Sequence, residues 1–102
     1  MTESRFESLH VTAKESFDIS LHSRPQSGFS WELVQVGDNE KSHGQIVQLV
    51  HMTWISQPGY QGALQVFHFS ALERGAAKLV FSYKRSWETV ALKQATYQVT
   101  VH

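Results

Sequence analysis

Apolar and polar residues alternate with a period of two along most of the chain, as they do in a β-strand with one buried face. In residues 15–22, for example, Phe17, Ile19 and Leu21 alternate with polar side chains. About seven such runs, spaced by roughly 8 to 12 residues, are typical of a sandwich or a barrel. The predicted strands cover residues 6–12, 15–22, 29–36, 45–55, 63–70, 77–84 and 94–101.

Two features modify this pattern without changing the fold class. The run 45–55 is too irregular to show one clean apolar face, so we expect a bulge or a bend in it. Helix signals are weak: residues 70–73 match a capping box, but Gly75 follows too soon for more than one turn, so this segment is read as a connection. Residues 88–94 have room for one short helical turn. With no repeat and no linker, we expect one all-β domain spanning residues 1–102.

The links between the strands predict a binding surface. If each strand runs opposite to the one before it, every second link lies at the same end of the domain, and the links 23–28, 56–62 and 85–93 lie together. These links contain both prolines, three of the six glycines, and two aromatic residues expected to be exposed, Tyr60 and Trp87. Loops at one end of a rigid sandwich carry the recognition surface of antibody-like domains.

Composition and charge exclude several classes of protein. The 102 residues contain no cysteine, which excludes disulfides, thiolate metal sites and a cysteine nucleophile. Nine Lys and Arg balance nine Asp and Glu, whereas a nucleic-acid binder needs a basic excess. The first eight residues contain two acids and no apolar core, unlike a signal peptide, and no apolar run approaches the ~20 residues that span a bilayer. We therefore expect a cytoplasmic protein with no nucleic-acid or membrane partner.

No motif in the sequence indicates catalysis, a metal or a cofactor. The six histidines are scattered singly and lack the short spacings of a zinc or iron site. His51 and His68 lie on strands that are neighbours in sequence and can meet, but we expect no carboxylate beside them. There is no Gly-x-Ser-x-Gly sequence, and Glu32 and Glu88 are isolated acids. The chain is therefore predicted not to be an enzyme and to need no cofactor.

Three segments in the predicted loops match a known family in order and spacing. The sequence Arg-Pro-Gln-Ser-Gly-Phe-Ser-Trp at 24–31 resembles the Asn-Pro-Thr-Thr-Gly-Tyr/Phe-x-Trp signature of chagasin-type inhibitors of papain-like cysteine peptidases. Gly-Tyr-Gln-Gly at 59–62 falls where that family has Gly-x-Gly-Gly. Tyr-Lys-Arg-Ser-Trp at 83–87 resembles its Tyr-x-Arg-Pro-Trp. The resemblance runs from about Phe17 to the end of the chain.

The sequence departs from the family pattern at five positions. Arg24 stands where the family has Asn, Gln26 and Ser27 stand for its two Thr, Gln61 stands for Gly, and Ser86 stands for Pro. These changes leave open an alternative function, an immunoglobulin-like protein-interaction module without peptidase inhibition. Such a module would bind another protein through the same loops or through a sheet edge.

The resemblance implies a fold and a mode of action. The fold is an immunoglobulin-like antiparallel β-sandwich of about seven strands without a disulfide, which acts as a monomer and inserts three loops into the cleft of a papain-like cysteine peptidase. The residues it assigns to peptidase binding are Arg24, Pro25, Gln26, Ser27, Gly28, Gly59, Tyr60, Gln61, Gly62, Arg85, Ser86 and Trp87.

The same resemblance suggests a role for each loop. Pro25 and a positive φ at Gly28 stiffen the first loop, Gln26 and Ser27 lie over the catalytic cysteine of the peptidase, and Trp87 is the aromatic anchor. Arg85 orients Trp87 or pairs with an acid of the peptidase. The segment 59–63 makes main-chain hydrogen bonds, as an added strand does. Against this stands a purely structural interpretation, in which Pro25 and Gly28 form an ordinary turn and Trp87 packs over the end of the sandwich.

Overall fold

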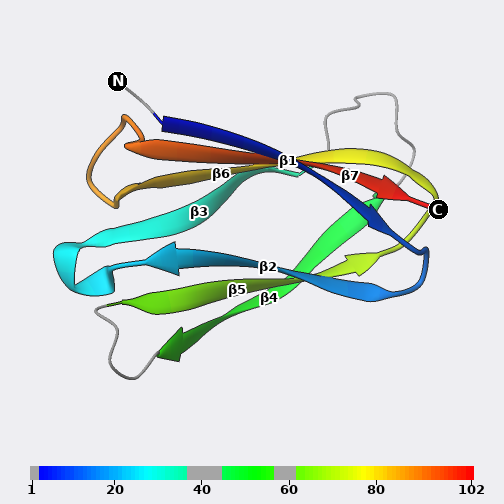
Figure 1. Ribbon diagram of the computed structural model, residues 1–102, viewed down its shortest axis with the longest axis horizontal. Helices are drawn as coiled ribbons and strands as arrows, with labels where there is room; N and C mark the ends of the chain where they lie inside the picture. The colour runs from blue at the N-terminus through cyan, green and yellow to red at the C-terminus, as the bar shows by residue number, and fades with distance from the viewer. Residues whose placement is uncertain (1–2, 37–44, 57–61) are drawn as a thin grey trace.

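The computed structural model describes residues 3–36, 45–56 and 62–102, and in this part of the chain strands form two sheets (Figure 1). The elements are β1 (Glu3–Val11), β2 (Ser16–Ser23), the 3-10 helix η1 (Pro25–Ser27), β3 (Phe29–Val36), β4 (Val47–Ser56), β5 (Ala63–Ala71), β6 (Gly75–Arg85) and β7 (Lys93–Val101). The predicted all-β sandwich of about seven strands is confirmed. Residues 70 and 71 are the end of β5, and the connection to β6 is limited to residues 72–74; residues 88–92 form bends and irregular chain instead of a helical turn.

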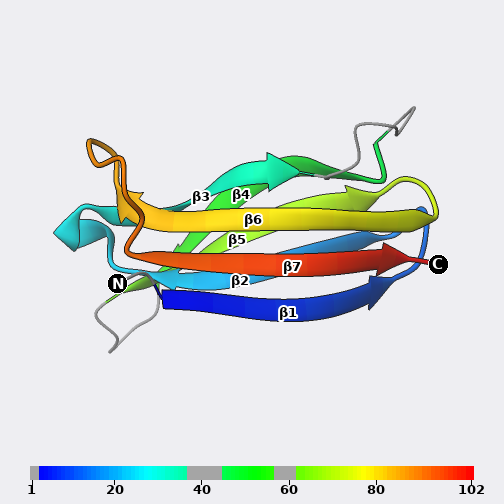
Figure 2. The same cartoon turned by 90° about the horizontal axis from the view of Figure 1, so that it is seen from above.

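The two sheets have the strand orders β1-β7-β6-β3 and β2-β5-β4. Pairing is antiparallel except between β1 and β7, which run parallel. The parallel pair corrects the expectation of an antiparallel sandwich throughout. Because β2 belongs to the opposite sheet, β1 cannot form a hairpin with it and instead lies along the edge of β7, as Figure 2 shows.

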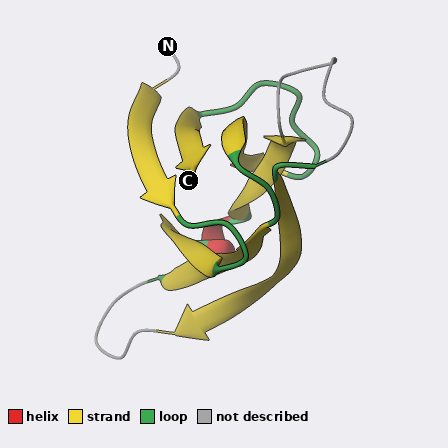
Figure 3. Cartoon of the chain, turned by 90° about the vertical axis from the view of Figure 1, so that its right-hand side faces the viewer, coloured by secondary structure: helices red, strands yellow, loops and turns green. Residues whose placement is uncertain are grey.

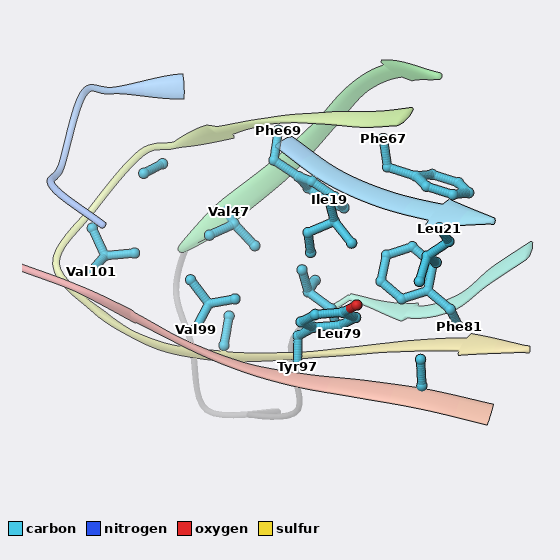
Figure 4. Packing of buried hydrophobic residues seen from close by; sticks show 13 residues of the cluster. Ile19, Leu21, Val47, Phe67, Phe69, Leu79, Phe81, Tyr97, Val99 and Val101 are labelled. Carbon is cyan, nitrogen blue, oxygen red and sulfur yellow. The ribbon is translucent and has the colours of Figure 1, made fainter. Parts of the chain in front are cut away.

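The core lies between the two sheets, where inward-facing side chains alternate along each strand (Figure 4). Phe81 is fully buried and meets three other rings at steep angles, with centroid distances of 4.8 Å to Phe67, 6.5 Å to Phe69 and 5.7 Å to Tyr97. Edge-to-face contacts of this kind add to the hydrophobic stabilisation of the buried rings. With no disulfide, this packing holds the two sheets together.

Two of the four edge strands, β3 and β4, contain a register shift. The one in β4 lies between Leu49 and His51 and confirms the irregularity expected in 45–55. The second, between Leu33 and Gln35, was not predicted. Bulges are frequent on edge strands, where they bend the strand and discourage pairing with another chain.

No helix within residues 3–36, 45–56 and 62–102 is long and apolar enough to cross a membrane. The helical segment that the structure does describe, η1, occupies the link after β2; in the end-on view of Figure 3 it is the red segment at the far end of the molecule. Three residues without periodicity leave no helical signal in a sequence, which is why the sequence analysis treated them as a plain loop.

Candidate functional site

The predicted clustering of alternate links at one end of the sandwich is seen in the strand registers. Phe29, the first residue of β3, pairs with Arg85, the last residue of β6. Ala63, the first residue of β5, pairs with the last residues of both β2 and β4. The connections β2–β3 and β6–β7 therefore lie at the same end as the residues that flank 57–61 (Figure 1). We call residues 24–28 the first loop, 56–62 the second loop and 85–93 the third loop.

The first loop is closed by its own hydrogen bonds. Arg24 lies outside the helical region, which the residue before a proline avoids, and Pro25 begins the 3-10 turn with its fixed φ. The N–H of Ser27 donates to the carbonyl of Arg24 at 3.0 Å, and the N–H of Gly28 donates to the carbonyl of Pro25 at 2.9 Å. Gly28 then has a φ of +88°, the left-handed conformation that glycine adopts without strain. The predicted positive φ at this glycine is confirmed.

Gln26 and Ser27 use their side chains differently, although both residues are exposed. The hydroxyl of Ser27 turns back and donates to the carbonyl of Arg24 at 2.6 Å, so it braces the loop. The side chain of Gln26 makes no hydrogen bond within the described part of the chain and is available to a partner. Of the two residues that the resemblance places over a catalytic cysteine, Gln26 therefore offers the free polar side chain.

Arg85 connects the first and third loops. Its guanidinium lies 4.6 Å from the ring centroid of Phe29 and 5.8 Å from that of Trp87, and its Nε donates to the carbonyl of Ser27 at 3.4 Å. Glu88 holds Arg85 from the other side: its carboxylate accepts from the Arg85 backbone N–H at 3.2 Å and lies 4.0 Å from the guanidinium. Arg85 therefore braces Trp87, in agreement with the orienting role expected for it.

Trp87 lies in the β-turn that directly follows β6. The N–H of Glu88 donates to the carbonyl of Arg85 at 3.0 Å, which makes Ser86 and Trp87 the two central residues of the turn. The side chain of Trp87 is 71% exposed, so it does not pack over the end of the sandwich as the structural interpretation required. A Cβ atom on residue 28 would lie 3.3 Å from Cη2 of Trp87, which shows how closely the indole approaches the first loop.

A polar and aromatic layer supports the loops from below. The N–H of Arg24 donates to the hydroxyl of Tyr83 at 3.2 Å, and the ring of Tyr83 lies against those of Phe29 and Trp31, at 5.3 and 4.9 Å between centroids. The indole N–H of Trp31 donates to the carbonyl of His22 at 2.8 Å. Through these contacts Trp31 shapes the first loop from within the domain.

Gln65 is a supporting residue that the sequence analysis missed. It is 1% exposed and makes two hydrogen bonds to the main chain of Trp31, accepting from its N–H at 2.7 Å and donating to its carbonyl at 3.0 Å. The signal in the sequence was a polar residue at an inward position of β5, between Ala63 and Phe67. Such a residue must find partners inside the domain.

A pocket of about 410 Å³ opens between the first loop and the start of β7. Arg24 and Lys93 lie at this pocket, and the rings of Tyr83 and Phe29 line it. The ammonium group of Lys93 lies 5.6 Å from the ring centroid of Tyr83. The pocket therefore combines basic groups at its opening with aromatic rings in its wall.

Most of the second loop lies outside the described residues. Gly59, Tyr60 and Gln61 belong to the segment 57–61, so their assignment to a binding surface stays a prediction. Gly62 is described, half-buried, immediately before β5. Its position beside Ala63 puts it at the same end of the sandwich as the first and third loops.

No group of three His, Cys, Asp or Glu side chains that could hold a metal ion occurs within the described ranges.

His51 and His68 do meet, with ring centroids 4.3 Å apart, and the expectation that no carboxylate lies near them was wrong. The Nδ1 of His68 lies 2.8 Å from Oδ1 of Asp18, and its Nε2 lies 3.0 Å from Oγ1 of Thr53. Cross-strand register brings these side chains together on the solvent face of the sheet β2-β5-β4, and both ring nitrogens of His68 are engaged there.

Comparison with known families identifies one match. Residues 10–101 match the family described as Chagasin family peptidase inhibitor I42. The match covers both described loops of the candidate surface and the second loop as well. No curated protein sequence matches the chain significantly.

Solved structures with the same fold include three that align with nearly the whole chain. The cysteine protease inhibitor EhICP2 from Entamoeba histolytica is similar with a TM-score of 0.76 and 18% identity, over 99% of this chain and 96% of that one. The solution structure of amebosin gives 0.69 and 21%, over 100% and 99%. PbICP-C, solved in complex with falcipain-2, gives 0.74 and 14%, over 99% and 91%. At these identities the likeness shows the fold.

Proposed function

We propose that this chain, which belongs to the chagasin family of peptidase inhibitors, inhibits papain-like cysteine peptidases reversibly and competitively by inserting its loop end into their active-site cleft. Membership of an inhibitor family agrees with the prediction that the chain is not an enzyme. The structural neighbour PbICP-C was solved in complex with falcipain-2, which supports a peptidase as the partner.

The observation that carries the proposal is the exposed indole of Trp87, held against a preformed first loop. A tryptophan that is 71% exposed has no role in the core, and Arg85 restricts its position. Tryptophan is among the residues most enriched at the energetic centres of protein interfaces. A restricted aromatic side chain loses little conformational freedom when it docks, so more of its burial contributes to affinity.

The first loop explains how the protein can fill a cleft without being cleaved there. Its turn is closed by hydrogen bonds between Arg24 and Ser27 and between Pro25 and Gly28. A turn held in this way does not present an extended peptide to the catalytic thiol. Gln26, at the exposed side of the turn, is placed to donate or accept hydrogen bonds beside the catalytic cysteine and histidine of the peptidase.

The second loop would complete the proposed surface through its main chain. Glycines at positions 59 and 62 have no side chain to shield the backbone, so main-chain hydrogen bonds to a partner, as an added strand makes them, are the expected contact. Tyr60 and Gln61 would flank the pairing segment. This loop would contact the side of the cleft opposite to the one that Trp87 occupies.

The direct test is titration of papain and of a cathepsin L-type peptidase with the purified protein. We expect competitive inhibition at or below about 1 μM, and we expect Trp87→Ala to weaken it by about 2 kcal/mol or more, which is roughly thirtyfold. The matched control is Phe6→Ala, because Phe6 is also a largely exposed aromatic residue, at 64%, but it lies within β1 and belongs to none of the three loops. This control should leave the inhibition constant unchanged.

Two results would contradict the proposal. Absence of inhibition at micromolar concentration would favour the alternative, an immunoglobulin-like interaction module. Equal effects of Trp87→Ala and Phe6→Ala on the inhibition constant would mean that the loop end is not the contact surface.

A further inference from the structure

A second pair of histidines lies at the end of the sandwich opposite the candidate surface. His10 is in β1, and His102 directly follows β7; the parallel register of these strands ends at the pair Val11 and Val101. The N–H of His102 donates to the carbonyl of Val11 at 2.9 Å, which continues the pairing beyond β7. Nδ1 of His10 lies 2.9 Å from Nε2 of His102. Both residues are exposed.

The two rings face each other through these nitrogens. Their planes differ by only 14°, and their centroids are 5.2 Å apart although the nitrogens are 2.9 Å apart. The centroid distance exceeds the nitrogen–nitrogen distance by about two ring radii. This is the case only when both nitrogens lie on the line that joins the centroids. The rings are therefore nearly coplanar and meet head-on. One nitrogen carries the shared proton, and its N–H points along the line of centroids at the lone pair of the other nitrogen.

The other histidine pair of the described structure has a different geometry. The centroids of His51 and His68 are 4.3 Å apart with an interplanar angle of 23°, so these rings overlap face to face. Their nitrogens do not converge, and those of His68 already face Asp18 and Thr53. His51 and His68 therefore lack the converging nitrogens that make a chelate.

We infer that His10 and His102 form a two-histidine binding site for a divalent transition-metal ion such as Zn²⁺. Zinc–nitrogen bonds of about 2.0–2.1 Å at a tetrahedral angle place the two nitrogens about 3.3 Å apart. The pair at 2.9 Å reaches that spacing when the nitrogens separate by a few tenths of an ångström and each ring turns by about 35°, so that both lone pairs point at the metal; exposed histidine side chains can do this because their χ2 torsion is broad. The ring that donates the shared proton moves it to its other nitrogen, so the metal replaces the proton between the rings.

The donor set determines which ions bind. Two neutral imidazoles suit Cu²⁺, Ni²⁺ and Zn²⁺, with Cu²⁺ strongest, whereas Mg²⁺ and Ca²⁺ require oxygen ligands. Since no third His, Asp or Glu joins the pair in the described ranges, water completes the coordination. Such a site is open and exchangeable, unlike the closed four-ligand sites of structural zinc.

A bound metal would stabilise the attachment of β1. This strand lies at the edge of its sheet beside β7, and its residues from Ser4 to Ser8 are exposed. Leu9 and Val11 are the β1 side chains packed against the core. A metal held by His10 and His102 links the two strands near the point where this packing occurs. Because the paired histidines of the folded chain bind the metal more tightly than the separated histidines of the unfolded chain, the metal raises the thermal midpoint.

The test uses full-length protein without a histidine tag, titrated with Zn²⁺ in a calorimeter and melted with and without the metal. We expect one Zn²⁺ per chain, a monomeric complex in sedimentation, and a midpoint raised by about 5 °C or more at tenfold saturation. Mg²⁺ at the same concentration should give no shift. His10→Gln and His102→Gln should each abolish zinc binding while melting at the same temperature as the wild type in the absence of metal.

The matched control is His51→Gln, which removes one ring of the stacked pair and should leave zinc binding intact. The inference is overturned if the wild type binds no Zn²⁺ at 100-fold molar excess, if either His10→Gln or His102→Gln keeps its affinity, or if the metal acts by joining two chains. None of these readouts depends on peptidase inhibition, so the inference stands or falls separately from the proposed function.

Discussion

Gln65 and Trp31 are joined by two hydrogen bonds that cross from one sheet to the other. Trp31 lies in β3, an edge strand, and the N–H and C=O that it offers to Gln65 are those on the side away from β6. The buried amide thus pairs with the free edge as a neighbouring strand would. It keeps the edge of β3 from pairing with another chain and fixes β3 directly below the first loop.

We predict that Gln65→Leu lowers the free energy of unfolding by about 2 kcal/mol, because it leaves the Trp31 N–H and C=O without partners in a half-buried position. Urea unfolding measures the change. Gln48→Leu is the control, since Gln48 is an exposed residue on β4 and its replacement should change stability by less than about 0.5 kcal/mol. Equal losses in both variants would mean that the amide of Gln65 has no special role.

The hydroxyl of Ser27 gives a second prediction. Ser27→Ala removes its 2.6 Å hydrogen bond to the carbonyl of Arg24 and loosens the first loop. We expect inhibition of papain to weaken about fivefold, the equivalent of about 1 kcal/mol. Ser27→Thr, which restores the residue of the family signature and keeps the hydroxyl, should inhibit like the wild type. If Thr is as weak as Ala at this position, the hydroxyl does not brace the loop.

Gly28 should be intolerant of a side chain for two independent reasons. Its φ of +88° is strained for alanine, and the added Cβ would lie 3.3 Å from Cη2 of Trp87. We predict that Gly28→Ala lowers stability by about 1 kcal/mol and weakens inhibition by about tenfold. Thermal unfolding and the inhibition constant for papain measure the two effects.

Gly75→Ala is the matched control for this variant. Gly75 has a φ of +145°, and a Cβ there would meet Cδ1 of Ile46 at 2.9 Å, so the variant should also lose stability. It lies at the far end of the sandwich, where β6 pairs with the end of β7, and it should therefore leave inhibition unchanged. A similar loss of inhibition in both glycine variants would show that global stability, and not loop geometry, controls binding.

The alternation of apolar residues was enough to predict the strands and the end at which the first and third loops meet. Because each strand runs opposite to the one before it, every second link lies at the same end of the domain. The position of the loops therefore follows even when the pairing of the strands is unknown. The same pattern could not predict that β1 pairs in parallel with β7, because alternation reports which face of a strand is buried and not which strand lies beside it. The family resemblance indicated Trp87 as the aromatic anchor, and the exposed side chain of Trp87 in the structure is consistent with that role.

Long-range contacts between side chains could not be predicted from the sequence. Gln65 reaches Trp31 across 34 positions, and Asp18 reaches His68 across 50, because of sheet register and layer packing. Register depends on the whole sheet and on its bulges, such as the shift between Leu49 and His51. No local pattern of residues contains that information.

Ser86, where the family signature has proline, leads to the last prediction. It is the first central residue of the turn from Arg85 to Glu88, the position that proline favours in turns. Arg85 before it ends β6 in the extended conformation that a following proline requires, and the N–H of Ser86 donates no hydrogen bond within the described part of the chain.

Ser86→Pro should therefore stabilise the protein by about 0.4–1 kcal/mol, because it restricts the unfolded chain without loss of a native hydrogen bond. It should also tighten papain inhibition by about two- to fivefold, since the turn that carries Trp87 is stiffer before docking. Thermal unfolding and the inhibition constant are measured beside Ser86→Ala, which lacks the ring and should resemble the wild type in both. A lower thermal midpoint for the proline variant would mean that the turn needs a backbone conformation that proline cannot adopt, and that this chain presents Trp87 differently from the rest of its family.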